Sequence, residues 1–279
     1  MNPFVVTLAR AVLCNFFEHC FTMIDGLCHS DLKLGTAKKA LEKLFSEAKN
    51  AKIAKVLLCN LPGRQFDGGD GFANEDILGE ASQYDGFFRV FAGIDPSRPD
   101  ALERLHFYKK NGASGIKLHP RLHNYCIEKD FCVDIVRKSG ELGLPVIICG
   151  FLDGINLMLG NSPAAFGRLA KLCPGTKILM AHAGGHHIID SVMVMKRCEN
   201  LYLDISFSIL YYRGSRRVMD DIKYSLESSG ARRISWGTDY PDRPYAETVR
   251  SSLEEIEKMN LVETAKKRLF DESAEEFCA

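Results

Sequence analysis

The sequence predicts a single (β/α)8 TIM barrel, an α/β fold, from three observations. Short apolar segments of strand length alternate with amphipathic segments of helix length from residue 22 to the C-terminus. The strand segments are apolar throughout, as expected for parallel strands covered on both faces by helices. No linker or shift in composition divides the chain. An open doubly wound sheet is the second choice, and the missing glycine fingerprint of dinucleotide-binding folds weakens it.

Each predicted strand is followed by a predicted helix. The strands are expected over residues 22–27, 53–59, 87–94, 115–119, 146–149, 177–182, 201–206 and 234–236. The helices are expected over residues 36–52, 74–84, 100–111, 129–142, 162–172, 187–197 and 215–228, with further helices after Pro244. Asn74 is a good N-cap residue and is expected to start its helix. The Gly- and Asp-rich loop 63–71 is expected to be irregular, either a mobile lid or a plain surface insertion.

The first 21 residues are predicted to form an added helix outside the barrel, which would comprise residues 22–279. The stretch from Phe4 to Phe21 is apolar enough to suggest a signal peptide. However, Arg10 interrupts it, and no small-x-small cleavage site follows. We therefore expect an extra helix, with a cleaved signal as the minor alternative.

The composition is that of an ordinary soluble globular protein. The 36 basic residues balance the 36 acidic ones, so nothing attracts the whole chain to nucleic acid or a membrane. The ten cysteines include no C-x-x-C pair, which argues against a four-cysteine zinc knuckle and suggests thiols in a reducing compartment. We expect a cytoplasmic protein with a small-molecule substrate and no nucleic-acid or membrane partner, and we allow for a homodimer.

Polar and sulfur-bearing side chains stand at the ends of several predicted strands. Successive strand residues point to opposite faces, so Asp25, Leu27 and His29 should share a face of the first strand while Cys28 points away. Lys117 and His119 should share a face of the fourth strand, at its last positions. The strand-end residues expected to meet at one mouth of the barrel are His29, His119, Cys149, His182 and Asp239.

Each of these residues also has a structural explanation. Asp239 could cap the helix that starts near Tyr245, and a single strand-end histidine is more often structural than a metal ligand. Asp204, within a predicted strand, could orient a neighbouring side chain. Nitrogen, sulfur and carboxylate donors converging in one cleft would nevertheless suit a zinc-type site or metal-free acid–base catalysis.

Five motifs in order resemble the amidohydrolase superfamily: GIKLHP at 115–120, LPVII at 144–148, ILMAHAGG at 178–185, LYLDIS at 201–206 and ISWGTDYP at 234–241. More narrowly, they resemble the amidohydrolase-related branch that includes aminocarboxymuconate semialdehyde decarboxylase, from about Met23 to Phe277. The resemblance implies a (β/α)8 barrel with one divalent metal ion, usually zinc. Its ligands would be an H-x-H pair on strand one, a His on strand five and an Asp on strand eight, with the strand-six His beside the metal-bound water.

The match to the implied metal ligands is incomplete. The H-x-H pair falls on Leu27 and His29, and the strand-five His falls on Cys149. The strand-six His is His182 and the strand-eight Asp is Asp239. Leucine cannot ligate a metal, whereas cysteine binds zinc well as a thiolate.

Three functions remain open, and we place the first slightly ahead. In the first, His29, Cys149 and Asp239 hold zinc or another divalent metal in a hydrolase or decarboxylase acting on a small carboxylated or cyclic molecule. There His182 would shuttle a proton.

The substrate in that first function would be held by basic side chains. Lys117 or His119 would orient a substrate carboxylate or carbonyl, and Arg121 and His123 are further candidates for an anionic group.

The second function is a metal-independent, lactone-type hydrolase of the same fold, with His29, His182 and Asp239 as acid, base and orienting carboxylate. The third is a catalytically inactive pseudo-enzyme that binds a ligand through the same cleft.

Overall fold

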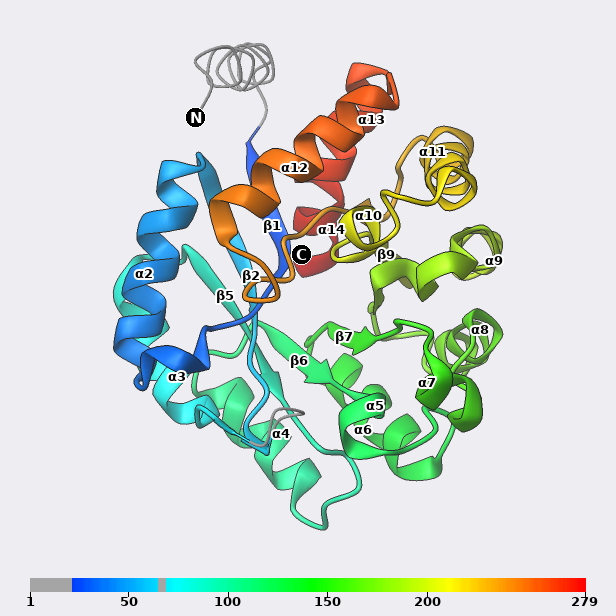
Figure 1. Ribbon diagram of the computed structural model, residues 1–279. Helices are drawn as coiled ribbons and strands as arrows, with labels where there is room; N and C mark the ends of the chain where they lie inside the picture. Colours follow the sequence, from blue (N-terminus) through cyan, green and yellow to red (C-terminus); the bar gives the residue numbers. More distant parts are fainter. Residues whose placement is uncertain (1–21, 65–68) are drawn as a thin grey trace.

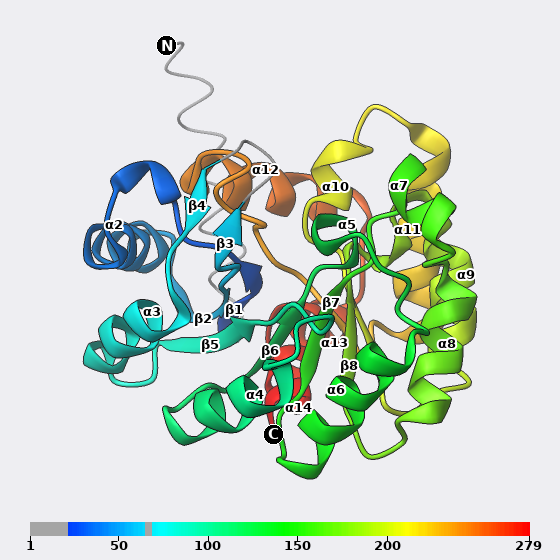
Figure 2. The same cartoon turned by 90° about the horizontal axis from the view of Figure 1, so that it is seen from below.

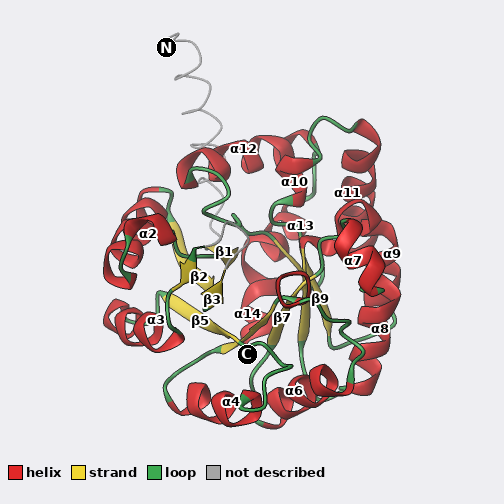
Figure 3. Cartoon of the chain, turned by 60° about the horizontal axis from the view of Figure 1, so that its bottom comes forward, coloured by secondary structure: helices red, strands yellow, loops and turns green. Residues whose placement is uncertain are grey.

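The computed structural model describes residues 22–64 and 69–279, which form the predicted barrel of eight parallel strands (Figures 1 and 3). The predicted helix over residues 1–21 lies outside the described residues. The strands follow the sheet order β1-β2-β5-β6-β7-β8-β9-β10. Their bounds are Met23–Cys28, Ile53–Cys59, Phe88–Gly93, Gly115–Leu118, Val146–Cys149, Ile178–Ala181, Leu201–Asp204 and Ile234–Ser235.

Helices cover the outside of this barrel, as Figure 3 shows. The longer ones are α2 (Ala37–Asn50), α3 (Asn74–Ala81), α4 (Ala101–Lys110), α6 (Asp130–Glu141), α8 (Pro163–Leu172), α9 (Ile188–Met195), α11 (Arg216–Ser229) and α12 (Tyr245–Lys258). Their bounds agree with the predicted segments to within about three residues. None of the helices within residues 22–64 and 69–279 is long and apolar enough to cross a membrane.

Shorter elements lie mainly in the connections, and of these only η2 falls wholly within a predicted helix, 74–84. They are the helices η1 (Leu32–Leu34), η2 (Ser82–Tyr84), α5 (Pro120–His123), α7 (Gly154–Leu159), η3 (His182–His187) and α10 (Ser208–Tyr211). The chain ends with α13 (Glu263–Lys267), η4 (Arg268–Glu272) and α14 (Ser273–Cys278).

The barrel is brought together at the seam between its first and last strands. The Gly26 amide donates to the Trp236 carbonyl over 2.9 Å, and the Asp239 amide donates to the Leu27 carbonyl over 2.9 Å. A Cβ atom at Gly237 would lie 2.5 Å from the Leu27 backbone nitrogen, so only glycine allows this close approach. The seam therefore fixes the position of Asp239 beside β1.

One end of the barrel interior is sealed by apolar side chains. Phe277 of α14 stacks on Phe91 with ring centroids 5.9 Å apart. Lys177, directly before β8, donates to the carbonyl of Glu276 in α14. Helix α14 therefore closes the amino-terminal end of the strands (Figure 2), which leaves the carboxyl end for a cavity.

The side-chain alternation predicted for β1 is wrong at Asp25. The pairing of β1 with β2 shifts register before and after Asp25, and such an irregularity offsets the alternation of faces. Leu27 lies in the inner apolar cluster, whereas Asp25 accepts a hydrogen bond from Tyr245 of the outer helix α12. Asp25 thus does not share a face with Leu27.

Asn74 does not act as the predicted N-cap. Ala73 occupies the cap position, and Asn74 is buried in the first turn of α3. Its side-chain nitrogen donates to the Gly93 carbonyl over 2.9 Å, and its side-chain oxygen accepts from the Asn60 side chain over 2.8 Å. Asn74 therefore ties the ends of β2 and β5 together, because both its donor and its acceptor are needed there.

The two ends of the loop 63–71 are more regular than predicted, while residues 65–68 lie outside the described residues. The short strands β3 (Gly63–Arg64) and β4 (Asp70–Gly71) pair in antiparallel fashion. This pairing closes the base of the loop, which glycine-rich composition alone did not indicate.

Candidate active site

A cavity of about 430 Å³ opens at the carboxyl ends of the barrel strands. The strand-end residues predicted from the sequence line it, and so do Lys117 and Arg121, whereas His123 does not. The lining residues are His29, Ser30, Asp31, Leu32, Lys33, Cys59, Asn60, Leu61, Lys117, His119, Arg121, Cys149, Phe151, His182, Phe207, Asp239, Pro241 and Asp242. Their size and mixed polarity suit a small polar molecule.

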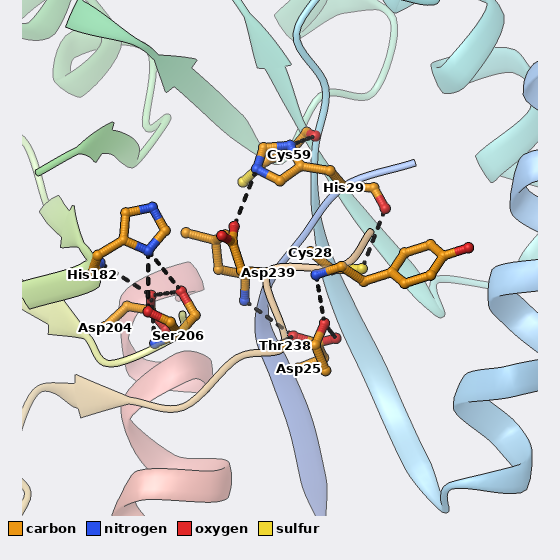
Figure 4. Close-up of polar contacts among 11 residues, drawn as sticks. Asp25, Cys28, His29, Cys59, His182, Asp204, Ser206, Thr238 and Asp239 are labelled. Atoms are coloured by element: carbon orange, nitrogen blue, oxygen red, sulfur yellow. Dashed lines mark hydrogen bonds and ion pairs between the residues drawn. The ribbon is translucent and has the colours of Figure 1, made fainter. Parts of the chain in front are cut away.

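His29 and Asp239 face each other across the seam of the barrel (Figure 4). The His29 Nδ1 atom lies 2.7 Å from the carbonyl oxygen of Cys59. A carbonyl can only accept, so Nδ1 carries a proton and Nε2 faces the Asp239 Oδ1 atom at 3.6 Å.

The proton of this pair resides on the carboxyl group at neutral pH. Burial, followed by the charges of Lys117 and His119, lowers the pKa of His29 well below its usual value. Burial also raises the pKa of Asp239 to about 8, although the charge of Lys117 opposes the shift. Asp239 is therefore a neutral acid beside a neutral imidazole.

A buried hydrogen-bond network supports Asp239 from behind. The Thr238 amide and hydroxyl donate to the Asp25 carboxylate over 2.8 and 2.7 Å. The Tyr245 hydroxyl donates to the same group over 2.9 Å. Asp239 does not cap α12, which begins at Tyr245 after a Pro244 cap without a side-chain hydrogen bond.

His182 is held on the opposite side of the cavity by residues that follow β9. Its Nδ1 atom lies 3.1 Å from the Ser206 carbonyl oxygen and 3.2 Å from the Ser206 hydroxyl. Nδ1 therefore carries a proton in the neutral ring, which leaves the lone pair on Nε2. Figure 4 shows Nε2 on the side of the ring away from Ser206.

Asp204 fixes this arrangement, as the sequence suggested that it could orient a neighbour. Its carboxylate accepts hydrogen bonds from the Ser206 amide and hydroxyl and from the His182 amide. Burial raises the pKa of Asp204 to about 6, although the Ser206 hydroxyl opposes this shift. Ser206 was not singled out beforehand; the only signal was its place at the end of the LYLDIS motif.

Four non-glycine residues beside the cavity adopt positive φ angles. They are His182 at 63°, Ala183 at 47°, Phe207 at 60° and Asp239 at 53°. Such conformations are unfavourable for residues with a Cβ atom and tend to gather at functional sites. Here they follow β8, β9 and β10 and set the direction of His182, Phe207 and Asp239.

The basic side chains of the cavity differ in how far neighbouring groups compensate their charge. Lys117 is 1% exposed, and among the described residues its Nζ atom has no hydrogen bond or ion pair. His119 accepts from the Leu122 amide through Nδ1, so its Nε2 carries the proton. Arg121 donates to Asp153 over 2.7 Å, which partly compensates its charge. Lys117 therefore provides the strongest attraction for an anion.

Cys149 ends β7, directly beside Ala181 of β8 in the strand register. Its thiol is buried and interacts with the side chain of His182. Phe151 and Phe207 form an aromatic wall beside them, with ring centroids 6.1 and 5.9 Å from the His182 ring. Sequence reasoning did not identify this wall.

The donor set does not fit a divalent metal ion in this arrangement. Leu27 is fully buried and offers only methyl groups. The Nε2 atom of His29 faces the Asp239 Oδ1 atom at 3.6 Å, and Cys149 lines the same cavity. Within the described ranges, no three His, Cys, Asp or Glu residues form a group that could hold a metal. Ligation by His29, Cys149 and Asp239 stays a prediction.

The fold has close counterparts among solved structures. An uncharacterised TIM-barrel protein from Bordetella bronchiseptica is 18% identical, with a TM-score of 0.74 over 92% of this chain and 98% of that chain. A probable 2-pyrone-4,6-dicarboxylic acid hydrolase from Acinetobacter baumannii, with citric acid bound, is 13% identical, with a TM-score of 0.65 over 92% and 99% of the two chains.

A 5-carboxyvanillate decarboxylase from Novosphingobium aromaticivorans, complexed with manganese and a nitrobenzoic acid, is 13% identical, with a TM-score of 0.64 over 93% and 96% of the two chains. No curated protein sequence matches the chain. The family profile described as "Amidohydrolase", however, matches residues 65–277. This match spans most of the barrel and includes both His182 and Asp239, and the chain thus belongs to the amidohydrolase family.

Proposed function

We propose that this protein hydrolyses a lactone or similar cyclic ester that carries carboxylate groups, and that it does so without a metal ion. The observation that carries the proposal is geometric: His182, held through Nδ1 by Ser206, and the His29–Asp239 pair line one cavity together with the buried Lys117. His182 presents a lone pair on Nε2, whereas Asp239 holds a proton at neutral pH because its pKa is about 8.

The basic side chains would bind the substrate carboxylates. Lys117 lines the cavity with a buried charge, and the Nε2 proton of His119 adds a neutral donor. Burial lowers the pKa of His119 well below its usual value, so the ring stays neutral at pH 7. The ester ring would then lie between His182 and Asp239.

Ester hydrolysis uses both proton states directly. His182 accepts a proton from the attacking nucleophile, for which water is the simplest choice. Asp239 donates its proton to the ring oxygen as the carbon–oxygen bond breaks. His29 keeps Asp239 oriented through their 3.6 Å contact, and the product is a ring-opened hydroxy acid.

Two relatives in fold support carboxylated substrates. The Acinetobacter protein is named as a probable hydrolase of a pyrone dicarboxylic acid and contains citric acid. The Novosphingobium decarboxylase contains a nitrobenzoic acid. The ester substrate suits this chain better than a decarboxylation because its reaction needs an acid and a base but no separate electron sink.

A divalent-metal decarboxylase or hydrolase is the second candidate. It is favoured by the manganese in the Novosphingobium structure and by His29 and Asp239 at the matching positions. Zinc would also require a third protein donor, for which Cys149 is the nearest replacement.

Substrate assays on chelator-washed protein separate the two candidates. The substrates would be 2-pyrone-4,6-dicarboxylate, its neutral dimethyl ester and 5-carboxyvanillate. We expect ring opening of the dicarboxylate without added metal and a much slower reaction of the diester. Release of carbon dioxide from 5-carboxyvanillate only after addition of zinc or manganese would support the second candidate instead.

A further inference from the structure

We propose that Cys149 is the nucleophile of this site and forms a thioester with the substrate. The inference rests on the proposed ester hydrolysis, and it replaces direct attack by water with two covalent steps. The family resemblance implies a metal-binding histidine at this strand end. The proposal assigns the position a different role, that of the nucleophile.

The geometry of the strand ends carries this proposal. Cys149 and Ala181 are register partners on the adjacent parallel strands β7 and β8, so His182 follows directly beside the thiol. The Nδ1 atom of His182 is occupied by Ser206, which leaves Nε2 as the nitrogen that can take the thiol proton. Nucleophile, base and orienting group are thus arranged in sequence.

A second, independent feature marks the same space as a ligand site. Lys117 is 1% exposed and lines the cavity with Cys149 and His182. Its Nζ atom lacks a hydrogen bond or ion pair with the residues that the structure describes. A buried charge without a direct ion pair is costly even with the Asp204 carboxylate within electrostatic reach, and an anionic substrate would provide that direct contact.

The position of Cys149 differs from those of the neighbouring buried thiols. Cys28 lies in the outer apolar layer and is not among the residues that line the cavity. Cys59 lines the cavity on the side of His29, whose Nδ1 atom donates to the Cys59 carbonyl. Of these three thiols, Cys149 is the one that borders the cavity beside His182, the base that can take its proton.

The first step forms the sulfur–carbon bond and opens the ring. His182 takes the proton of the Cys149 thiol while Sγ attacks the ester carbonyl carbon. The carbon–oxygen bond of the ring breaks, and Asp239 gives its proton to the departing oxygen. The substrate is then held as a thioester, with His182 protonated and Asp239 ionised.

The second step consumes one water molecule and restores the site. Asp239 takes a proton from the water, and the hydroxide adds to the thioester carbon. The carbon–sulfur bond breaks, and the protonated His182 returns its proton to the Cys149 sulfur. The sum of both steps is ester plus water giving a hydroxy acid, with no oxidant or reductant involved.

Acid-quenched rapid mixing with 2-pyrone-4,6-dicarboxylate tests the thioester directly. In the wild-type protein we expect a mass increase equal to the whole substrate, located by peptide mapping on Cys149. Cys149→Ala should remove the adduct and lower kcat/KM by roughly 10³-fold or more. Cys28→Ala is the matched control, because Cys28 lies in the outer apolar layer, and it should keep both adduct and rate.

The outcomes separate this inference from the proposed function. If the wild-type protein opens the lactone but Cys149→Ala retains more than about a tenth of the rate, the nucleophile assignment is wrong while ester hydrolysis stands. If no lactone is opened, iodoacetamide labelling still tests the pair. Faster labelling of Cys149 than of Cys59, slowed about tenfold or more by His182→Gln, would support it. Equal labelling of both thiols would overturn it.

Discussion

On each side of the cavity, a histidine is tied through Nδ1 to a backbone carbonyl near the end of a neighbouring strand. His29 is tied to Cys59 at the end of β2, and His182 is tied to Ser206 just after β9. The two histidines differ in what Nε2 meets. His29 faces the protonated carboxyl group of Asp239, whereas His182 is left to interact with the Cys149 thiol.

This difference shows that the same hydrogen-bonding device supports two chemical roles. On the seam side, burial keeps the proton on Asp239, so the pair can act as an acid. On the opposite side, Asp204 and Ser206 hold His182 so that its lone pair stays available as a base. The partner of each histidine, rather than the histidine itself, therefore determines the direction of proton transfer.

The largest expected effect comes from removing the base. His182→Gln should lower kcat/KM for 2-pyrone-4,6-dicarboxylate by about 10²–10⁴-fold, the usual contribution of general base catalysis. The comparison predicts this because glutamine can keep a hydrogen bond near Ser206 but cannot accept and return a proton.

The matched control is His187→Gln, since His187 is half-exposed, paired with Asp190 and not among the residues that line the cavity. It should change kcat/KM little, and circular dichroism should show both variants folded. An unchanged rate in His182→Gln would remove His182 from the mechanism.

On the seam side, the raised pKa of Asp239 should be visible in the pH dependence of the free energy of unfolding. The folded protein binds the Asp239 proton up to about pH 8, whereas an unfolded chain releases it near pH 4. The free energy of unfolding should therefore fall as the pH rises from about 4 to about 8, by at most about 1.4 kcal/mol per pH unit from this group.

Urea unfolding of the wild-type protein and Asp239→Asn at pH 5, 7 and 9 measures this effect. Relative to the wild type, the variant should gain stability from pH 5 to pH 9, because asparagine stays neutral while the wild-type protein loses the stability linked to the Asp239 proton. Burial also raises the pKa values of Asp25 and Asp204 to about 6, but these groups are present in both proteins and cancel in the difference. Parallel stability curves would refute the raised pKa of Asp239.

A smaller effect is expected at the substrate-binding lysine between the two sides. Lys117→Met should raise KM for the dicarboxylate by about 10–100-fold, the range expected for hydrogen bonds to charged groups. The neutral dimethyl ester should be affected much less. Lys177→Met, at the amino-terminal end of β8, is the control. Equal losses for both substrates would indicate a structural role for Lys117.

The sequence predicted the barrel well because its signals are local. Short apolar strands and amphipathic helices between them gave bounds close to those observed, and the strand-end candidates all line one cavity. The second layer of the site was not predictable in this way. Ser206 supports His182 through contacts that span 24 residues, and no local pattern distinguishes such a serine from an ordinary one.

Two local rules also failed where tertiary contacts were stronger. The register shifts of β1 turned Asp25 toward Tyr245, so strict alternation gave the wrong face. Asn74 has the residue type of an N-cap, but its side chain satisfies Asn60 and Gly93 instead. Both residues position the strand ends that carry the site, which is where packing departs most readily from local preference.

The smallest expected effect concerns metal, and it tests whether the two sides of the cavity work without one. Chelator washing should leave lactone hydrolysis unchanged within about twofold, and elemental analysis should find well under one zinc ion per chain. The reason is that His29 and Asp239 alone give only two inherited donors, and two protein ligands rarely hold zinc. Leu27 removes the donor that the family resemblance places next to His29. If zinc does bind, Cys149 should be its third ligand, so Cys149→Ala should empty the site while Cys28→Ala leaves it occupied. Activity that is lost on chelation and restored by zinc alone would mean that the seam carboxyl group serves as a ligand and not as an acid.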